Sequence, residues 1–222
     1  MMKNPEISPL VKPLLRGHLH QAAFFFALGA CAMLIILSQH APTLVATLIY
    51  SLSQVGLFGV SALYHRPNWG TVGRMRMRRL DHSMIFVSIA GTFTPICMLA
   101  IPGAGGMKLL AIVWTTAVVG ILQCWFWGKA PKWLAALFYV AMGWMVFPYI
   151  SEINEALGLT SVVLLLTGGV IYTLGALIYA IKKPNPFPVY FGYHEIFHLL
   201  VVIAAICHFS VITRIVISLP CS

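Results

Sequence analysis

Residues 193–217 read YHEIFHLLVVIAAICHFSVITRIVI. The stretch is mostly apolar, and about 20 such residues in a helix cross a hydrocarbon core of roughly 30 Å. Its first turns carry His194 and His198, which share one helix face because they are four residues apart. That spacing lets a helix offer two imidazoles to one metal ion, and ionisable groups placed this deep in a membrane are costly and usually functional. The stretch therefore predicts a membrane helix that begins with two metal ligands.

The composition of the whole chain agrees with this prediction. The chain has 222 residues, of which 60% are hydrophobic and only 9% are charged. A typical soluble domain has about 25% charged residues and about 45–50% apolar residues, so this composition is that of a membrane protein. The formal charge of +9 does not indicate nucleic-acid binding, because the basic residues are confined to short gaps between apolar runs.

Seven apolar segments are long enough to span a bilayer. They are approximately Gln21–Ser38, Thr43–Tyr64, Ser83–Ile101, Leu109–Trp127, Trp133–Ile150, Leu159–Ile181 and Tyr193–Ile217. No gap is long enough to separate two domains, so we expect residues 1–222 to form one all-α, seven-helix membrane domain with a short segment, residues 1–18, before it. Pro95, which follows two threonines, predicts a kink in the third helix.

The basic residues predict the orientation of the bundle. The amino terminus and the gaps after the second, fourth and sixth segments hold twelve lysines and arginines, whereas the other side holds only Lys108 and Arg214. Because basic loops stay in the cytoplasm, we expect the amino terminus inside and the carboxyl terminus outside. The first apolar run continues without a break to Leu37, which favours an uncleaved membrane helix over a signal peptide.

The five cysteines include no Cys-x-x-Cys pair. Four lie inside apolar runs and the fifth, Cys221, is near the carboxyl terminus. Neither a disulfide framework nor a thiolate metal site is indicated.

This topology brings distant polar residues to one side of the membrane. The second segment runs inward and ends at His65, the third starts from that side with Asp81, and the last starts there with His194 and His198. Three neutral imidazoles with one open position are typical of catalytic zinc, which lowers the pKa of bound water towards 7. Asp81 would accept the proton of that water, and Ser61, one turn before His65, would support the water or the substrate oxygen.

Other interpretations of these residues remain open. A single intramembrane histidine often forms only a hydrogen bond between helices, and Asp81 would pair with a neighbouring arginine if it stood alone. The motif His194-Glu195-x-x-His198 also matches metalloproteases, in which the glutamate is the general base. Glu195 and Asp81 therefore compete for the role of base, although a third ligand on the second helix is not the usual protease arrangement.

The remaining histidines are weaker candidates. His208 lies about 15 Å beyond His198 along the helix, at about 1.5 Å per residue, which predicts a hydrogen bond between helices rather than a ligand. His82 points about 100° away from Asp81 on a helix and would support the site from behind it. His18 and His20 precede the first apolar segment.

The chain resembles the hemolysin III family, the bacterial branch of the progestin and adipoQ receptor (PAQR) superfamily. The matching residues follow the family's order and are Ser61-Ala-Leu-Tyr-His65, Leu80-Asp81-His82, Ala90-Gly-Thr-Phe-Thr-Pro95, Ala141-Met-Gly-Trp144, Gly168-Gly-Val-Ile-Tyr172, His194-x-x-x-His198 and Cys207-His208-Phe209. The stretch Arg16-Gly17-His18-Leu19-His20 departs from the acidic, asparagine-containing stretch of enterobacterial members.

The resemblance implies a seven-helix bundle in a bacterial cytoplasmic membrane, with a cytoplasmic amino terminus and zinc held by His65, His194 and His198. Ser61 and Asp81 match the serine and aspartate of the wider superfamily, which includes alkaline ceramidases that hydrolyse lipid amides. In that pattern the residue at the position of Glu195 is not part of the motif, which favours Asp81 over Glu195 as the base.

Three functions follow as hypotheses. The first is a zinc-dependent membrane hydrolase of a lipid amide, with membrane lipids as partners and a role in membrane homeostasis. The second is a sensor or receptor without enzymatic activity, in which zinc joins the second and seventh helices. The third is a cytolytic pore, which only the family name supports. The sequence indicates no nucleic-acid partner and no particular oligomeric state.

Overall fold

The described part of the chain is almost entirely helical. The computed structural model describes residues 12–127 and 131–218. Cys221 and two of the twelve basic residues counted above, Lys3 and Lys129, lie outside it. Its α-helices are α1 (His18–Leu37), α2 (Ala41–His65), α3 (Thr71–Pro95), α4 (Gly103–Phe126), α5 (Lys132–Gly143), α6 (Ile150–Leu157), α7 (Leu159–Ile181) and α8 (Tyr193–Ser218). A π-helical turn, η1 (Ile96–Ala100), continues α3, and a 3-10 turn, η2 (Trp144–Tyr149), joins α5 to α6.

Seven of the helical stretches in the described residues are long and apolar enough to cross a membrane. This confirms the predicted all-α, seven-span fold. One predicted boundary is wrong by a wide margin: α3 begins at Thr71, not at Ser83. Its first turns are rich in arginine, a good helix former, so the helix extends beyond the apolar stretch that predicted it.

The predicted kink at Pro95 takes the form of a change in helix type. Proline has no backbone N–H to donate, and the α-helical pattern ends there and continues as η1. The hydroxyl of Thr92 donates a hydrogen bond to the carbonyl of Ser88 at 2.9 Å. The Thr92 hydroxyl is therefore satisfied within the helix, one turn back, as is common for threonine in a membrane helix.

The fifth span is longer than predicted. The stretch from Glu152 to Gly158 was expected to be a gap, but most of it forms α6. Ile153 on this helix is fully buried, so α6 is held by core packing as well as by its own backbone. The helix ends at Gly158, whose φ of 76° is readily adopted only by glycine.

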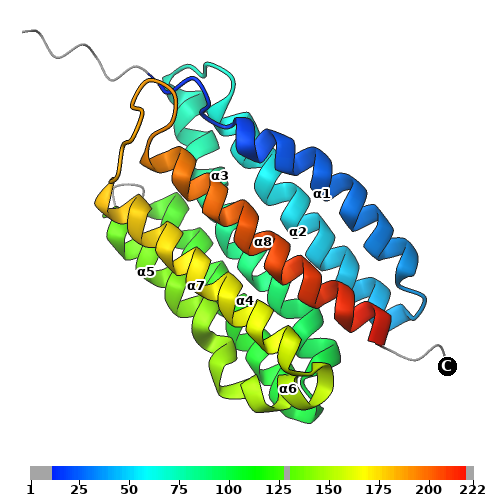
Figure 1. Cartoon of the computed structure of the whole chain (residues 1–222). Helices are drawn as coiled ribbons and strands as arrows, with labels where there is room; N and C mark the ends of the chain where they lie inside the picture. The colour runs from blue at the N-terminus through cyan, green and yellow to red at the C-terminus, as the bar shows by residue number, and fades with distance from the viewer. Residues whose placement is uncertain (1–11, 128–130, 219–222) are drawn as a thin grey trace, which may run out of the picture.

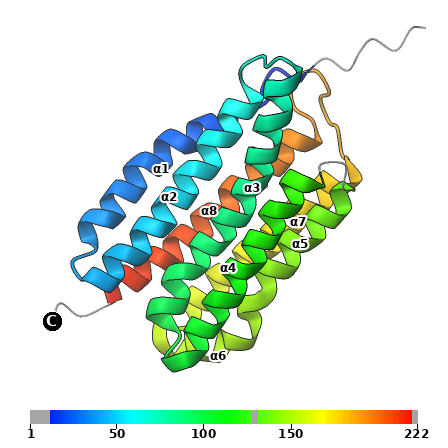
Figure 2. The same cartoon turned by 180° about the vertical axis from the view of Figure 1, so that it is seen from behind.

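The helices form one bundle in which distant segments meet at the same end. Helix α1 packs on α2 and α8, whereas α3 lies inside and contacts α2, α4, α5 and α8. Figures 1 and 2 show the segment that precedes α1, residues 12–17, together with the α2–α3 loop and the α7–α8 loop at one end, with α6 and the last turn of α8 at the other. The start of α8, the end of α2 and the first half of α3 therefore share one end of the bundle.

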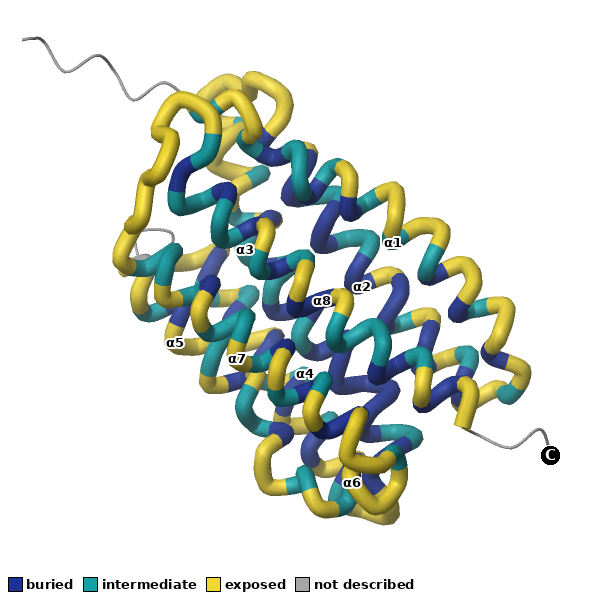
Figure 3. Tube along the Cα trace, viewed as in Figure 1, coloured by how far each residue is buried: buried dark blue, intermediate teal, exposed yellow. Residues whose placement is uncertain are grey.

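The outside of the bundle is apolar. In Figure 3 the exposed positions lie mainly on the outward faces of the helices and in the loops. Many of the exposed side chains are large and hydrophobic, among them Phe25, Phe26 and Ile36 on α1. Such a surface suits lipid rather than water, in agreement with a membrane-spanning bundle.

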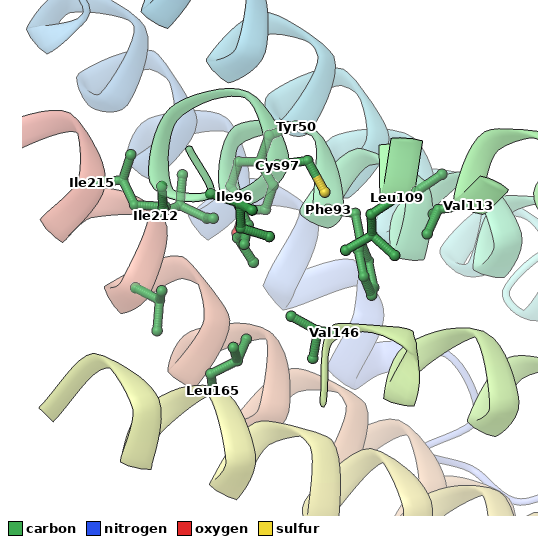
Figure 4. Close-up of a cluster of buried hydrophobic side chains, with 14 of the residues drawn as sticks. Tyr50, Phe93, Ile96, Cys97, Leu109, Val113, Val146, Leu165, Ile212 and Ile215 are labelled. Atoms are coloured by element: carbon green, nitrogen blue, oxygen red, sulfur yellow. The ribbon is translucent and has the colours of Figure 1, made fainter. Parts of the chain in front are cut away.

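Two apolar clusters hold the helices together. The larger one, part of which Figure 4 shows, joins α2, α3, α4, α7 and α8 through residues such as Tyr50, Phe93, Leu165 and Ile212. The smaller one packs α1 against α2 and α8 through Ala23, Leu57, Phe58, Val201 and Ala205. The second cluster keeps the first helix beside the last.

Substitution of Gly106 on α4 tests how closely this helix packs against η1. A Cβ atom at this position would lie 2.2 Å from the Cys97 carbonyl oxygen and 2.8 Å from that of Ile101. Backbone atoms cannot rotate away, so Gly106→Ala is expected to lower the free energy of unfolding by about 1–3 kcal/mol, seen as a lower melting temperature in detergent. Gly29→Ala on α1 is the control, because its Cβ atom would meet nothing within 4 Å. Equal melting temperatures for the two variants would contradict this account.

Candidate metal centre

Three histidines from two helices form a buried cluster at the loop-rich end of the bundle. His65 is the last residue of α2, and His194 and His198 lie in the first two turns of α8. One nitrogen from each ring lies within 4.8 Å of the other two, and the Nε2 atoms of His65 and His194 are 3.1 Å apart. This geometry agrees with the prediction from the sequence that the end of the second span and the start of the last one lie on the same side of the membrane.

The donor set fits a metal ion such as zinc. Zn–N bonds of about 2.0–2.1 Å in a tetrahedron place neighbouring nitrogens roughly 3.3 Å apart, close to the separation of His65 and His194. The rings of His65 and His198 are also near each other, with centroids 5.0 Å apart. Imidazole suits zinc as well as copper, iron and nickel, so the cluster can hold a metal ion, and its donors alone do not choose among these metals.

Asp81 faces the histidine cluster from α3. Its Oδ2 atom lies 3.9 Å from Nε2 of His65 and 3.7 Å from Nδ1 of His82. The residue is 9% exposed, so its carboxylate is largely shielded from solvent. A carboxylate this close to one metal ligand can accept a proton beside a metal ion.

Ser61 lies one turn before His65 on α2 and is also buried. Its hydroxyl lies beside the Asp81 carboxylate and is 2.8 Å from Nδ1 of His20. The two residues predicted to assist catalysis, Ser61 and Asp81, are therefore neighbours of each other and of His65.

Glu195, the competing base, is already engaged. Nε of Arg16 donates to its Oε1 atom, and the backbone N–H of Gly192 donates to Oε2 at 2.8 Å. Glu195 is 1% exposed, and its two oxygens hold the α8 amino terminus and the segment before α1 together. This geometry favours a structural role for Glu195 and leaves Asp81 as the carboxylate beside the cluster.

The pair formed by Arg16 and Glu195 predicts a large stability effect. Arg16→Met would leave a buried, unpaired carboxylate, and breaking a buried pair in this way costs about 3–5 kcal/mol. The melting temperature of the purified protein in detergent should fall sharply for Arg16→Met, whereas the double variant Arg16→Met/Glu195→Gln should recover part of the loss. A double variant as unstable as the sum of its single variants would show that the two side chains are not coupled.

The segment before α1 covers this end of the bundle, a role that sequence reasoning missed. The N–H groups of Leu14 and Leu15 donate to the carbonyls of Val189 and Tyr190 in the α7–α8 loop, at 2.9 and 3.3 Å. Gly17 has a φ of 82° and lies so close to His65 that a Cβ atom there would be 2.7 Å from the Cβ of that histidine. Only glycine combines this backbone conformation with this approach.

Lys12 joins the same segment to the α2–α3 loop. Its Nζ donates to the carbonyl oxygen of Arg66 at 3.2 Å. Burial, followed by the positive charges of Arg74, Arg16 and Arg66, lowers the pKa of its ammonium group. This end of the bundle is therefore strongly positive, in line with the basic gaps seen in the sequence.

His20 is a further functional candidate that the sequence did not single out. It lies in the first turn of α1, is 3% exposed and stacks flat on His198, with ring centroids 3.7 Å apart and planes 5° from parallel. Its position before the first apolar segment gave no sign of this contact, because the contact depends on how α1 packs against α8. The only signal in the sequence was an ionisable residue placed directly before an apolar run.

Two further histidines, His82 and His208, occupy supporting positions. His82 donates from Nδ1 to the Arg78 carbonyl at 2.8 Å, and its Nε2 atom lies 3.3 Å from the Tyr179 hydroxyl, in agreement with a place behind Asp81. His208 donates from Nε2 to the carbonyl of Leu165 on α7 at 3.1 Å. The predicted hydrogen bond between helices is therefore present at His208.

A largely apolar cavity opens from the cluster into the bundle. At one end it is lined by Ser61, Asp81, His194 and His198, and at the other by Ile96 and His208. His198 and His208 are ten residues apart on α8, so the cavity extends about 15 Å along the helix, roughly half of a hydrocarbon core. Apolar and aromatic side chains line the space between, which gives the polar cluster an apolar extension.

Comparison with known proteins agrees with the motifs in the sequence. A family model described as "Haemolysin-III related" matches residues 9–209. The chain is 35% identical over 185 residues to a protein named "Hemolysin-3" from Bacillus cereus, covering 82% of this chain and 81% of that protein. It is 31% identical over 185 residues to "Hemolysin-3 homolog" from Bacillus subtilis, covering 82% and 84%.

A more distant relative is a human protein. "Monocyte to macrophage differentiation factor" from Homo sapiens is 26% identical over 195 residues, covering 85% of this chain and 77% of the human protein. The similarity therefore extends over most of both chains and from bacteria to animals.

Proposed function

Because the chain belongs to the haemolysin-III-related family of multi-pass membrane proteins, we propose that it is a zinc-dependent hydrolase of lipid amide bonds. The family resemblance found in the sequence is confirmed by the family model and by the two Bacillus relatives. The observation that carries the proposal is the placement of Asp81 and Ser61 beside three clustered histidines, at one end of a largely apolar cavity.

His65, His194 and His198 would hold the zinc ion. When bound to three imidazoles, zinc polarises carbonyl groups and lowers the pKa of a water molecule towards 7. Asp81, 3.9 Å from the first of these ligands, would accept the proton of the attacking water and later deliver it to the departing amine. The carbon–nitrogen bond breaks, the water oxygen becomes part of the carboxylic acid, and the amine leaves with the proton.

The number of ligands favours catalysis over a purely structural metal. Structural zinc sites are closed by four protein ligands, whereas catalytic sites have three and keep one position for water or substrate. Among the described residues, the metal-ligand cluster contains three histidines, and the nearby Asp81 and Ser61 are two groups that can act on a substrate. Buried polar residues of this kind are costly in a membrane, and they usually serve a function.

The cavity supports a lipid as the substrate. A polar head would meet the histidines and Asp81, and an alkyl chain would lie along the apolar walls beyond them. Burying a methylene group contributes about 0.8 kcal/mol, so a long chain supplies much of the binding free energy. We expect the amide group of the lipid to lie beside the proposed zinc ion and the alkyl chain of the lipid to reach towards His208.

The orientation and location also belong to this proposal. Twelve of the fourteen basic residues in the sequence lie at the amino terminus or in the gaps on that side, so we place the centre at the cytoplasmic face of a bacterial inner membrane. The amine released by hydrolysis would then be delivered at that face, which suits a role in membrane homeostasis.

The test is direct cleavage by the purified protein. Zinc-loaded protein in mixed lipid–detergent micelles is expected to convert a ceramide to the free fatty acid and the long-chain base, measured by mass spectrometry. A matched lipid with an ester in place of the amide shows whether cleavage is specific for the amide bond. A matched protein sample stripped of zinc shows whether cleavage requires the metal. Zinc-loaded, folded protein that releases no fatty acid from any long-chain amide would overturn the proposal.

One observation favours the second candidate, a sensor with structural zinc. The ligands come from α2 and α8, so a bound ion would cross-link two helices that are far apart in sequence. A protein of this kind needs the three histidines for stability but does not need Asp81 as a proton acceptor. Replacement of Asp81 therefore separates the two functions, as argued in the Discussion.

A further inference from the structure

His20 makes two contacts that lie in different directions from its ring. The face of the ring packs on His198, with centroids 3.7 Å apart and planes 5° from parallel. The edge of the ring meets Ser61, with Nδ1 2.8 Å from the hydroxyl oxygen. The side chain thus touches one metal-ligand candidate and one catalytic candidate at the same time.

The surroundings hold the ring firmly. His20 is 3% exposed, and the ring of Phe58 meets it edge-on with centroids 5.3 Å apart. Its Nε2 atom is buried and makes no hydrogen bond with any described residue. An ionisable side chain buried in a membrane helix is costly, and such residues usually serve a function.

We propose that His20 is a positioning residue with two separable actions: its face fixes the orientation of the metal ligand His198, and its Nδ1 fixes the hydroxyl of Ser61. The second action rests on the proposed hydrolase function, whereas the first requires only that the cluster binds zinc.

Both actions follow from ordinary physical effects. A ring packed flat on a ligand limits its rotation, so the coordinating nitrogen loses less freedom when the metal binds. Groups that orient metal ligands from behind typically change metal affinity or activity by about 10–100-fold when they are removed. A hydroxyl held by an imidazole cannot rotate freely, so Ser61 is kept where it meets Asp81.

Two substitutions separate the actions. His20→Phe keeps a flat aromatic ring that can stack on His198 but removes the nitrogen that contacts Ser61. His20→Asn keeps a polar group near the position of Nδ1, which can still bond to Ser61, but removes the ring. The same two substitutions at His40, which precedes α2 near the opposite end of the bundle, serve as matched controls.

The measurements are the zinc dissociation constant, obtained by competition with a chelator, and ceramide turnover per bound zinc. His20→Phe is expected to keep the zinc affinity of the wild type and to lose turnover by about 10–100-fold. His20→Asn is expected to bind zinc about tenfold more weakly and to lose less turnover per bound zinc than the phenylalanine variant.

The outcomes are distinguishable from failure of the hydrolase itself. If the wild type binds zinc but cleaves no amide, the zinc constants still decide: weaker binding by His20→Asn than by His20→Phe supports the ligand-orienting action, and equal constants overturn it. If the wild type is active, full turnover by His20→Phe overturns the action on Ser61. Should His20→Asn fail to fold, His20→Ala takes its place in the zinc measurement, because it also removes the ring that stacks on His198, and its zinc constant is compared with that of His20→Phe in the same way.

Discussion

The His194→Ala protein is expected to purify without bound zinc. His194 supplies one of three nitrogens that lie within 4.8 Å of one another, and a site with two imidazoles retains a metal far more weakly than one with three. We expect zinc, measured by atomic emission after dialysis against a mild chelator, to fall from near one ion per chain to background. His40→Ala, which removes a histidine remote from the cluster, should keep the wild-type content.

The His65→Ala protein sharpens this result. If the motif at the start of α8 worked as in metalloproteases, its two histidines would be the ligands from this region and His65 would not matter. The Nε2 atom of His65 instead lies 3.1 Å from that of His194, so we expect His65→Ala to lose zinc as completely as His194→Ala. Wild-type zinc content in His65→Ala would contradict the three-histidine site.

The Asp81→Asn protein is expected to keep its zinc and lose its turnover. Asparagine is nearly isosteric with aspartate but cannot accept the proton of an attacking water, and general-base catalysis contributes about 10²–10⁴-fold. Ceramide cleavage per bound zinc should fall by that factor, with a melting temperature close to that of the wild type. A folded, zinc-loaded Asp81→Asn protein with wild-type turnover would exclude Asp81 as the base.

The same variant also separates hydrolase from sensor. A sensor whose zinc only joins α2 to α8 would respond to the loss of His194 through instability and would tolerate Asp81→Asn in a physiological assay. Loss of that physiological function in Asp81→Asn, with folding and zinc content unchanged, would remove the sensor as a candidate.

Much of the fold was predictable because lipid places strong demands on sequence. Seven apolar runs, with no complete span between His65 and Asp81 and four between Asp81 and His194, were enough to place these residues at one end of the bundle. The predicted helix boundaries were wrong where a helix extends beyond the apolar stretch that crosses the membrane. The start of α3 is polar and lies outside the apolar stretch, and α6 follows a 3-10 turn that contains Pro148.

The less predictable part of the site is its amino-terminal side. Glu195 was a reasonable candidate base until Arg16 was found bonded to it, and that pair links residues 179 positions apart. His20 likewise reaches His198 only because the cluster containing Phe58 and Val201 packs α1 against α8. Spacing within a helix reveals a shared face, but it does not tell which distant helix will lie against that face.

The order of the site residues along the chain has a consequence for biosynthesis. His20, His65 and Asp81 leave the ribosome early, whereas His194 and His198 follow only after about six spans have entered the membrane. A nascent or prematurely terminated chain therefore holds one of the three imidazoles of the proposed zinc site. If the site is as proposed, such a chain would not retain zinc, metal uptake would be a mark of complete synthesis, and an unmetallated fraction in the cell would report chains whose final helix has not docked.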